Sequence, residues 1–416
     1  MGRYLIKGGK PLYGEIHIQG AKNSVLPIFA AALLTEEKVT ITNCPMLTDV
    51  ENMAEILRSL GATATISDGV AEIKAEQVAS YEIPACLAKE IRSSIFLLGS
   101  VLARKGKAKV AYPGGCNIGL RPIDIHLKAL KEMGVKVEEK EGYILCDAQE
   151  VEATAITLDY PSVGATENVM LLASLTEGTT TIANAAQEPE IEDLEQFINA
   201  MGGKVSGAGT PFIKIKGVKS LVGAEFRTMG DRIVAGTYLI GAALCGGELT
   251  LKGVNPEHLL SLNGKLSKGS CKVVSKNDII HITASGKVEA LDDVVTQPYP
   301  GFPTDLQAQI CVLASVAKGS SLVVENIFET RFKHLPELIK MGARVKLKDR
   351  VAVFNGVDDL YGAEVNSYDL RGGAAMVLAG LRAKGTTIVN DSHYVERGYE
   401  DIVRDLTGVG ADIKKI

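Results

Sequence analysis

Residues 169–203 read VMLLASLTEGTTTIANAAQEPEIEDLEQFINAMGG, and this stretch shows the unit from which the chain is built. Its first seven residues are apolar or small on nearly every side of a helix, so we expect that helix to be buried all round. The run Thr179-Thr180-Thr181-Ile182 is rich in β-branched residues and predicts a strand. Residues 191–201 carry apolar side chains at helical spacing, and glycines follow at the usual helix stop. The stretch therefore predicts a buried helix, a strand and an exposed helix.

The small-residue turn that ends this stretch recurs roughly every 70 residues, a longer period than that of most solenoids. The copies are Leu60-Gly61-Ala62, Met133-Gly134-Val135, Met201-Gly202-Gly203, Met341-Gly342-Ala343 and Val409-Gly410-Ala411, with Leu262-Asn263-Gly264 as a weaker one. A buried-helix pattern precedes each turn, in residues 29–34, 95–102, 169–175, 234–244, 310–316 and 374–381. Each unit is predicted to run strand, buried helix, strand, exposed helix, strand, strand, which is an α/β fold.

Six units suggest two globular halves of three units each, divided near Met229. A closed ring of three units needs one more strand than the C-terminal half provides. We therefore expect residues 1–21 to join that half. The predicted domains are residues 22–229, and residues 1–21 together with residues 230–416.

The composition excludes several functional classes. The net charge of -5, without a dense Lys and Arg block, argues against nucleic acid as the main partner. The apolar runs are too short to cross a bilayer, and the N-terminus turns polar by Lys7, so no membrane insertion, no signal peptide and a cytoplasmic location are expected. Seven Cys without CxxC or zinc-like spacing argue against a disulfide framework and against a metal site.

Charged or small residues stand just before each buried helix. They are Lys22-Asn23, Arg92, Ser162-Val163-Gly164, Asp231-Arg232, Thr304-Asp305 and Asp369-Leu370-Arg371. The helix dipole disfavours cations at a helix start, so the repeated Lys and Arg residues indicate an anionic ligand. Simple helix capping stays open as the alternative.

Residues 112–124, YPGGCNIGLRPID, form the most distinctive stretch of the chain. Three Gly and two Pro residues predict a long loop before a helix, and such loops often carry function. Cys116 should be exposed in this loop, with Arg121 near enough in sequence to favour the thiolate. A lone Cys is usually structural, but the loop context favours a reactive one.

These segments, together with Gln187-Glu188-Pro189-Glu190, Arg331 and Glu396-Arg397-Gly398-Tyr399, resemble the enolpyruvyl transferase family, in particular its UDP-N-acetylglucosamine 1-carboxyvinyltransferases. The resemblance covers essentially the whole chain. It implies a two-domain inside-out α/β barrel of six βαβαββ repeats, three per domain, with the active site in the cleft between the domains. It implies no metal and no organic cofactor.

The reaction implied by the resemblance is transfer of the enolpyruvyl group of phosphoenolpyruvate to the 3-hydroxyl of UDP-N-acetylglucosamine by addition and elimination, with release of phosphate. This is the first committed step of peptidoglycan synthesis. By resemblance, Cys116 is the general acid and the target of the epoxide antibiotic fosfomycin, and Asp305 is the candidate base. The cations Lys22, Arg121 and Arg397 would hold the phosphate of phosphoenolpyruvate, and Arg331 and Arg371 its carboxylate.

The resemblance also assigns contacts with the sugar nucleotide. These are Asn23, Arg92, Arg121, Pro122, Ile123, Asp124, Ile125, Ser162, Val163, Gly164, Asp305 and Ile327. Supporting or domain-closing ion pairs are expected from Glu188, Asp231, Arg232 and Asp369. The histidines His126, His334 and His393 are expected to be packed or on the surface and not to act as acid or base.

Two alternatives remain at this point. One is the sister enzyme that uses shikimate 3-phosphate as acceptor, which lacks the Cys loop. The other is a weakly active paralogue that binds the nucleotide and regulates cell-wall synthesis through a protein partner, although all candidate catalytic residues are present.

Overall fold

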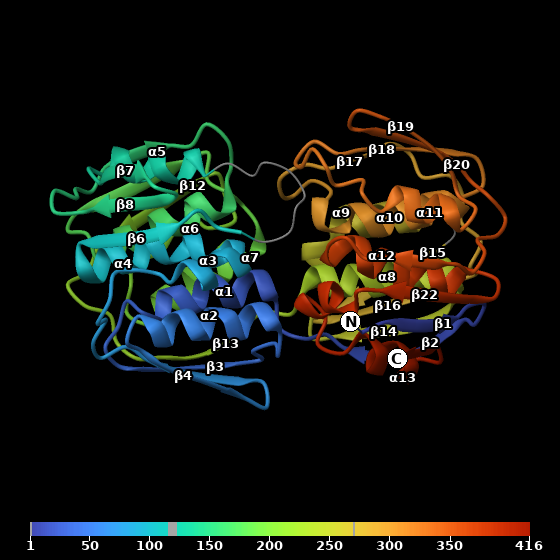
Figure 1. Ribbon diagram of the computed structural model, residues 1–416, viewed down its shortest axis with the longest axis horizontal. Helices are drawn as coiled ribbons and strands as arrows, with labels where there is room; N and C mark the ends of the chain where they lie inside the picture. The colour runs from blue at the N-terminus through green and yellow to red at the C-terminus, as the bar shows by residue number, and fades with distance from the viewer. Residues whose placement is uncertain (1, 115–122, 269–270) are drawn as a thin grey trace. The chain divides into compact units, whose positions relative to one another are not determined.

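The computed structural model describes residues 2–114, 123–268 and 271–416, and these residues form two compact units (Figure 1). The middle unit comprises the described residues from Gly20 to Met229, and the terminal unit comprises those up to Gln19 and from Gly230 onward. Helices and mixed sheets alternate through both units, which confirms the predicted α/β class. Within the described ranges, no helix is long and apolar enough to span a membrane.

The middle unit has buried helices inside and sheets outside. Its inner helices are α1 (Lys22–Ala32), α4 (Leu97–Lys105) and α6 (Val163–Ala173), and nearly every residue of α1 and α6 is buried. The helices α2 (Thr48–Ser59), α5 (Asp124–Glu132) and α7 (Pro189–Ala200) are buried on one side only. The sheet orders are β13-β3-β5-β4, β6-β8-β7 and β11-β12-β10-β9.

The strands of the middle unit are short. They are β3 (Lys38–Thr42), β4 (Thr63–Ser67), β5 (Val70–Lys74), β6 (Lys107–Ala111), β7 (Lys136–Lys140), β8 (Tyr143–Asp147), β9 (Ala155–Thr157), β10 (Thr179–Ala183), β11 (Val205–Ser206), β12 (Phe212–Lys216) and β13 (Glu225–Arg227). Buried and exposed residues alternate along most of them, as expected for sheets with one face on the core.

The terminal unit repeats this arrangement. Its inner helices are α8 (Arg232–Cys245), α10 (Gln307–Val316) and α12 (Leu370–Arg382), and its remaining α-helices are α9 (Leu260–Lys268), α11 (Leu335–Lys340) and α13 (Ile402–Gly408). The sheet orders are β15-β16-β14-β2, β17-β18-β20-β19 and β21-β22-β1-β23. The strands are β1 (Tyr4–Lys7), β2 (Leu12–His17), β14 (Gly247–Lys252), β15 (Cys271–Lys276), β16 (Ile279–Ala284), β17 (Val294–Val295), β18 (Ser320–Val324), β19 (Arg344–Lys348), β20 (Val351–Asn355), β21 (Glu364–Asn366), β22 (Thr386–Asn390) and β23 (Asp412–Lys415).

Two sheets of the terminal unit are completed by N-terminal strands. The strand β2 pairs in parallel with β14, from Leu12 opposite Gly247 to His17 opposite Lys252. The strand β1 lies between β22 and β23 and is antiparallel to both. In return, β13 pairs in parallel with β3 of the first repeat. The first strands of the first and fourth repeats have therefore exchanged places.

Five of the six predicted turns are confirmed. Gly61, Gly134, Gly202, Gly342 and Gly410 follow their helices with φ between +89° and +106°, the left-handed region that favours glycine. The sixth turn, predicted at Leu262-Asn263-Gly264, is wrong, because these residues lie inside α9. Leu262 and Leu266 are both buried and stand four residues apart, so the apolar face of the helix continues past Gly264.

Candidate active site

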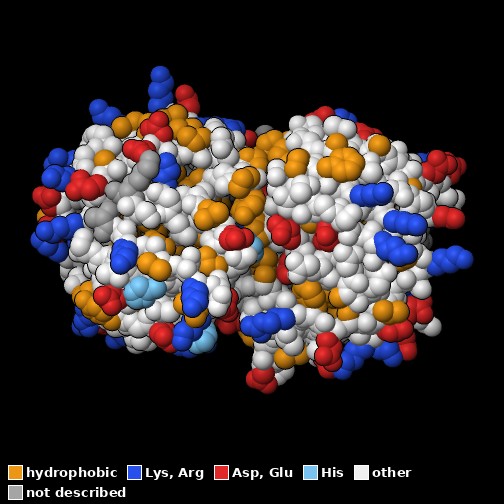
Figure 2. Space-filling model, turned by 180° about the vertical axis from the view of Figure 1, so that it is seen from behind, with side chains coloured by type: hydrophobic (Ala, Val, Ile, Leu, Met, Phe, Trp, Pro, Cys, Tyr) orange, Lys and Arg blue, Asp and Glu red, His pale blue; other side chains and the backbone are white. Residues whose placement is uncertain are grey.

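On the side of the molecule shown in Figure 2, Lys and Arg side chains are interspersed with Asp and Glu side chains over both units. No extended face of one sign is visible there. In the terminal unit, two arginines form a local cluster that could meet an anionic ligand.

This cluster consists of Asp305, Arg331 and Arg371. Asp305 lies in the short helix η3 (Thr304–Leu306). Its Oδ1 accepts a hydrogen bond from Nη2 of Arg331 at 2.7 Å, and its Oδ2 accepts from Nη2 and Nε of Arg371 at 2.9 and 3.2 Å. The two arginine side chains are 4% exposed, whereas that of Asp305 is 25% exposed. The guanidiniums are closed off from water and the carboxylate is partly open to it.

An acidic cap positions Arg371. Asp369 precedes α12, and its Oδ1 accepts hydrogen bonds from the backbone N–H groups of Arg371 and Gly372, both at 3.0 Å. Asp231 caps α8 in the same way, through the N–H groups of the second and third residues after it, at 2.8 and 3.0 Å. A carboxylate at the cap offsets the unfavourable position of a cation in the first turn. Capping, which the sequence left open, is thus present at both helices.

Capping does not test the ion pairs predicted for these residues. Arg232 directly follows the cap of α8, is buried, and lies 5.6 Å from the centre of the Tyr299 ring. Glu188 directly precedes α7. The supporting or domain-closing roles of Glu188, Asp231, Arg232 and Asp369 stay predictions.

The charge on Arg371 is favoured by its surroundings. Burial opposes the charge, but Asp305, Tyr399 and Asp231 favour it and raise the pKa of Arg371 above its ordinary value. The hydroxyl groups of Tyr399 and Thr237 are hydrogen-bonded at 2.7 Å, and burial is the main cause that raises the pKa of Tyr399. Arg371 therefore remains a cation in the core of the unit.

Both guanidiniums retain an unused donor. Nη1 of Arg371 and Nε of Arg331 are buried, and neither has a hydrogen-bond acceptor among the described residues. A buried charged donor without an acceptor is unfavourable by about 1–3 kcal/mol or more. Because the two cations share a single carboxylate, the cluster is suited to receive the oxygens of a second anion.

Glu325 is a buried acid next to this cluster that the sequence did not single out. It is fully buried, and its carboxylate accepts hydrogen bonds from the hydroxyls of Thr296 and Thr304 at 2.9 and 3.0 Å. It also accepts from the backbone N–H groups of Ile327 and Phe328 at 2.8 and 3.0 Å. Thr304 adjoins Asp305, so Glu325 ties the Ile327 segment to the Asp305 helix.

In the middle unit, Lys22 is the first residue of α1. Its Nζ lies 2.7 Å from Oδ2 of Asp49, and the two side chains are 14% and 5% exposed. Asp49 stands 27 positions after Lys22, so nothing local in the sequence indicates this pair. Asn23 follows Lys22 in the same turn and is exposed.

A second acid supports the start of α1. The hydroxyl of Ser24 donates a hydrogen bond to Asp193 of α7, and the backbone N–H of Met229 donates to the same carboxylate oxygen at 3.2 Å. Burial raises the pKa of Asp193 to about 6, although these two hydrogen bonds act in the opposite direction. Asp193 therefore joins α1, α7 and the end of the middle unit.

Seven of the twelve predicted contacts with a sugar nucleotide lie at three helix starts of the middle unit. Arg92 opens the 3-10 helix η1 (Arg92–Phe96), Ile123 precedes α5 with Asp124 and Ile125 in its first turn, and Ser162 caps α6, which begins with Val163 and Gly164. His126 of α5 links them, since its Nδ1 lies 2.9 Å from Nδ2 of Asn168 on α6. The same Nδ2 donates to the carbonyl of Ile95 in η1 at 3.0 Å.

Gly164 has no room for a side chain. A Cβ at this position would lie 2.6 Å from Cε1 of His126 and 2.8 Å from Cε1 of Phe96. The rings of α5 and η1 therefore pack directly on the first turn of α6. The small residue at this helix start therefore allows the close approach of the two rings.

The three histidines behave as expected. His126 is buried, and its pKa is lowered to about 3 by burial and then by the charge of Arg92. His334 is buried as well, and burial is the main cause that lowers its pKa to about 4. His393 is exposed. The two buried rings are therefore neutral at pH 7.

The last predicted site residues to be placed are Arg397, Cys116, Arg121 and Pro122. Arg397 is half-buried and ends the 3-10 helix η4 (Ser392–Arg397) in the terminal unit. Cys116, Arg121 and Pro122 lie outside the described residues. In the part of the chain that is described, no group of three or more His, Cys, Asp or Glu residues is arranged to hold a metal ion.

Comparisons with known proteins identify the family of the chain. The family model described as EPSP synthase (3-phosphoshikimate 1-carboxyvinyltransferase) matches residues 6–406. A "UDP-N-acetylglucosamine 1-carboxyvinyltransferase 2" of Caldanaerobacter subterraneus subsp. tengcongensis is 52% identical over 416 residues, covering 100% of both chains. A "UDP-N-acetylglucosamine 1-carboxyvinyltransferase" of Halothermothrix orenii is 47% identical over 416 residues, again covering 100% of both chains.

Solved structures share the fold. The enolpyruvyl transferase NikO from Streptomyces tendae superposes with a TM-score of 0.90 at 26% identity, covering 100% of this chain and 98% of its own. The EPSP synthase from Acinetobacter baumannii superposes with a TM-score of 0.77 at 17% identity, covering 100% of both chains. The predicted two-domain enolpyruvyl transferase fold is therefore confirmed.

Proposed function

The chain belongs to the carboxyvinyltransferase family, and we propose that it transfers the enolpyruvyl group of phosphoenolpyruvate to the 3-hydroxyl of UDP-N-acetylglucosamine, with release of phosphate. This reaction is the first committed step of peptidoglycan synthesis. We place the enzyme in the cytoplasm, where both substrates are found.

The choice of acceptor rests on the relatives. Full-length relatives that are 44–52% identical to this chain carry the name UDP-N-acetylglucosamine 1-carboxyvinyltransferase. The solved EPSP synthase, whose family name refers to 3-phosphoshikimate, is only 17% identical and supports the fold alone. Shikimate 3-phosphate is therefore the less favoured acceptor.

One observation supports the proposed donor site most strongly. The buried guanidiniums of Arg331 and Arg371 share the carboxylate of Asp305 and each keeps a buried N–H without an acceptor among the described residues. Planar guanidinium groups bind carboxylates through paired hydrogen bonds. We assign these two arginines to the carboxylate of phosphoenolpyruvate. Lys22, Arg121 and Arg397 would hold its phosphate.

The same contacts suggest how Asp305 becomes a base. With two guanidiniums bound to it, the Asp305 carboxylate is stabilised in its charged form and is a poor proton acceptor. When the carboxylate of phosphoenolpyruvate binds, the two arginines would donate some of their hydrogen bonds to it instead of to Asp305. The Asp305 carboxylate would then be available to the 3-hydroxyl. It then accepts the hydroxyl proton as the oxygen adds to C2 of the donor. Cys116 would protonate C3 to give the tetrahedral intermediate. In the elimination, one proton would return from C3 to the Cys116 thiolate as the phosphate leaves, which restores the double bond of the transferred group.

The sugar nucleotide is assigned to the helix starts gathered around His126. Arg92, Asp124 and Ser162 provide a cation, a carboxylate and a hydroxyl at the beginnings of three helices. Helix starts bind phosphate groups through free N–H groups. We propose that the nucleotide is held mainly by residues of the middle unit and the donor carboxylate by residues of the terminal unit.

A phosphate-release assay tests the proposal. The purified full-length chain should release phosphate from phosphoenolpyruvate when UDP-N-acetylglucosamine is added, and not when shikimate 3-phosphate is added. Release with shikimate 3-phosphate alone would assign the chain to the sister activity. Binding of UDP-N-acetylglucosamine without any release would favour a regulatory paralogue.

A further inference from the structure

The strand β19 is a free edge of its sheet. In the order β17-β18-β20-β19 it pairs with β20 alone among the described strands. Its sequence, RVKLK, alternates cationic and apolar residues. Val345 and Leu347 lie opposite the buried residues Phe354 and Ala352, so they point to the core side, and the three cations point outward.

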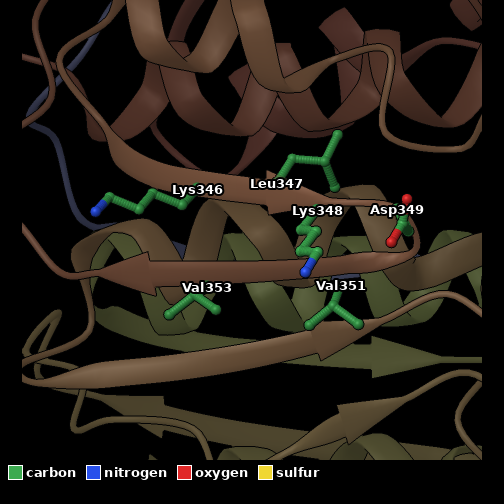
Figure 3. Close-up of a pocket in the computed structure, with 6 residues that line it drawn as sticks. All are labelled: Lys346, Leu347, Lys348, Asp349, Val351 and Val353. Atoms are coloured by element: carbon green, nitrogen blue, oxygen red, sulfur yellow. The ribbon is translucent and has the colours of Figure 1, made fainter.

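Leu347 is exposed although it occupies a core-side position. Its exposed fraction is 49%. It lines an open hollow of about 790 Å³ together with Lys346, Lys348, Asp349, Val351 and Val353 (Figure 3). In this view Leu347 and Lys348 point to opposite sides of the strand. The hollow is thus bordered by apolar side chains and by the aliphatic stems of two lysines.

The outward side chains of β19 are three cations, and the acid Asp349 lines the same hollow. Arg344, Lys346 and Lys348 form no ion pair with any residue that the structure describes. In the middle unit, by contrast, the outward Lys38 of β3 lies 2.5 Å from Glu72 on the neighbouring strand. The edge therefore presents uncompensated positive charge beside exposed apolar surface.

Protection of the edge against aggregation is the plain alternative, because natural edge strands often carry Lys. The strand β7 shows how this chain protects an equivalent edge. It lies at the edge of its own sheet, with the sequence KVEEK, and has Glu139 at the position that corresponds to Leu347. Its Lys136 forms an ion pair with Glu150 at 3.2 Å. Protection does not require an exposed leucine, so β19 departs from this pattern.

We propose that β19 is a docking edge for an extended segment of a partner protein in which acidic and apolar residues alternate. Added as a further strand, such a segment would pair its backbone with the free N–H and C=O groups of β19. Its carboxylates would lie beside Lys346 and Lys348, and its apolar residues beside Val345 and Leu347. A membrane surface fits less well, because the hollow is lined by Val and Leu without the aromatic residues that anchor interfacial segments.

The test uses a short synthetic peptide of alternating Glu and Val and the full-length chain. The double variant K346E/L347E gives β19 the acidic character of β7, a pattern that the same fold already tolerates. The wild-type chain should bind the peptide saturably in fluorescence anisotropy, and the variant should bind at least about tenfold more weakly. Two control peptides should bind poorly to the wild type. One is a matched peptide of alternating Lys and Val, and the other is the Glu peptide with N-methyl groups along one backbone edge. Enolpyruvyl transfer, measured in parallel, should be unchanged in the variant.

Four outcomes would overturn the proposal. If wild type and variant bind the peptide equally, β19 is not the binding site. If the N-methylated peptide binds the wild type as tightly as the unmodified peptide does, binding does not occur by strand addition. If the peptide does not bind but phosphatidylglycerol vesicles do, the edge is a membrane contact. If the chain instead self-associates in sedimentation and the variant does not, the edge joins two copies of the chain.

Discussion

Arg371 donates hydrogen bonds from both Nε and Nη2 to the same carboxylate oxygen of Asp305, at 3.2 and 2.9 Å. Arg331 binds the other oxygen of that carboxylate at 2.7 Å. One acid thus holds two buried guanidiniums in place while it remains the most exposed member of the cluster. In the proposed reaction this acid is both the element that orders the donor site and the base.

Asp305→Asn should therefore impair both functions. The substitution keeps the size of the side chain but removes its charge and its ability to take a proton, so turnover should fall by about 10²–10⁴-fold. The free energy of unfolding should fall by about 1–3 kcal/mol, because hydrogen bonds to buried charged groups are weakened. Steady-state phosphate release and urea unfolding measure the two effects. Glu72→Gln, which removes an exposed ion pair with Lys38, should change stability by less than about 1 kcal/mol. Normal turnover of the Asn variant would exclude Asp305 as the base.

Gly164→Ala should disturb the nucleotide site. The added Cβ would meet the rings of His126 and Phe96 at 2.6 and 2.8 Å, and such overpacking costs about 1–3 kcal/mol. The affinity for UDP-N-acetylglucosamine, measured by calorimetry, should fall together with stability. Gly264→Ala is the matched control, because Gly264 lies within α9 with nothing within 4 Å of an added Cβ. That control should stabilise the chain by about 0.5–1 kcal/mol. Unchanged nucleotide affinity in Gly164→Ala would contradict the assignment of this helix start.

The buried His126 should make stability depend on pH. Its pKa is lowered to about 3 in the folded chain, whereas an unfolded His has a pKa near 6.5. Below about pH 6.5 the unfolded state binds the extra proton, so the contribution of His126 to stability is full above that pH and is lost progressively as the pH falls toward 3. The difference in unfolding free energy between the wild type and His126→Gln should shrink by about 2 kcal/mol from pH 7 to pH 5. Parallel urea titrations at the two pH values measure it, and a constant difference would show that this His is not held neutral.

Cys116 should be the reactive thiol of the chain. Among the described Cys residues only Cys86 is exposed, and burial raises the pKa of Cys146 and of Cys245 to about 12. In a Cys86→Ala background, fosfomycin and other electrophiles should label Cys116 alone, and UDP-N-acetylglucosamine should speed the reaction. Cys116→Ser should lose most turnover, whereas Cys116→Asp should keep much of it and resist fosfomycin, because Asp can still donate a proton. Peptide mapping by mass spectrometry reports the label. Labelling of another Cys, or normal turnover of Cys116→Ser, would contradict the role assigned to Cys116.

Much of the fold could be predicted from the sequence because its signals are local. The glycine after each outer helix and the apolar residues on every side of each inner helix repeat in the chain, and both follow from short-range backbone and burial rules. Gly264 was misread because a glycine also occurs inside a helix when the apolar face continues on both sides of it. Residues 1–21 were expected to join the C-terminal half, but the individual partners, β14 for β2 and β3 for β13, could not be predicted, since strand pairing is decided by contacts far apart in the chain.

The candidate site could be predicted only in part. Asp305, Arg331 and Arg371 were each identified, but they are separated by 26 and 66 positions, and no local pattern shows that one carboxylate binds both arginines. Asp49 and Glu325 were missed for the same reason, because a single acid in a helix or after a strand is unremarkable in sequence. Their importance appears only when Lys22 and the Ile327 segment are seen beside them.

The identity of the product tests the central claim most directly. The chain should be incubated with phosphoenolpyruvate, UDP-N-acetylglucosamine and shikimate 3-phosphate together, and the products analysed by mass spectrometry and NMR. UDP-N-acetylglucosamine should gain one enolpyruvyl group on its 3-oxygen, with one phosphate released per product, and Asp305→Asn should form it far more slowly. Enolpyruvyl found on shikimate 3-phosphate, or on neither acceptor, would contradict the function proposed here.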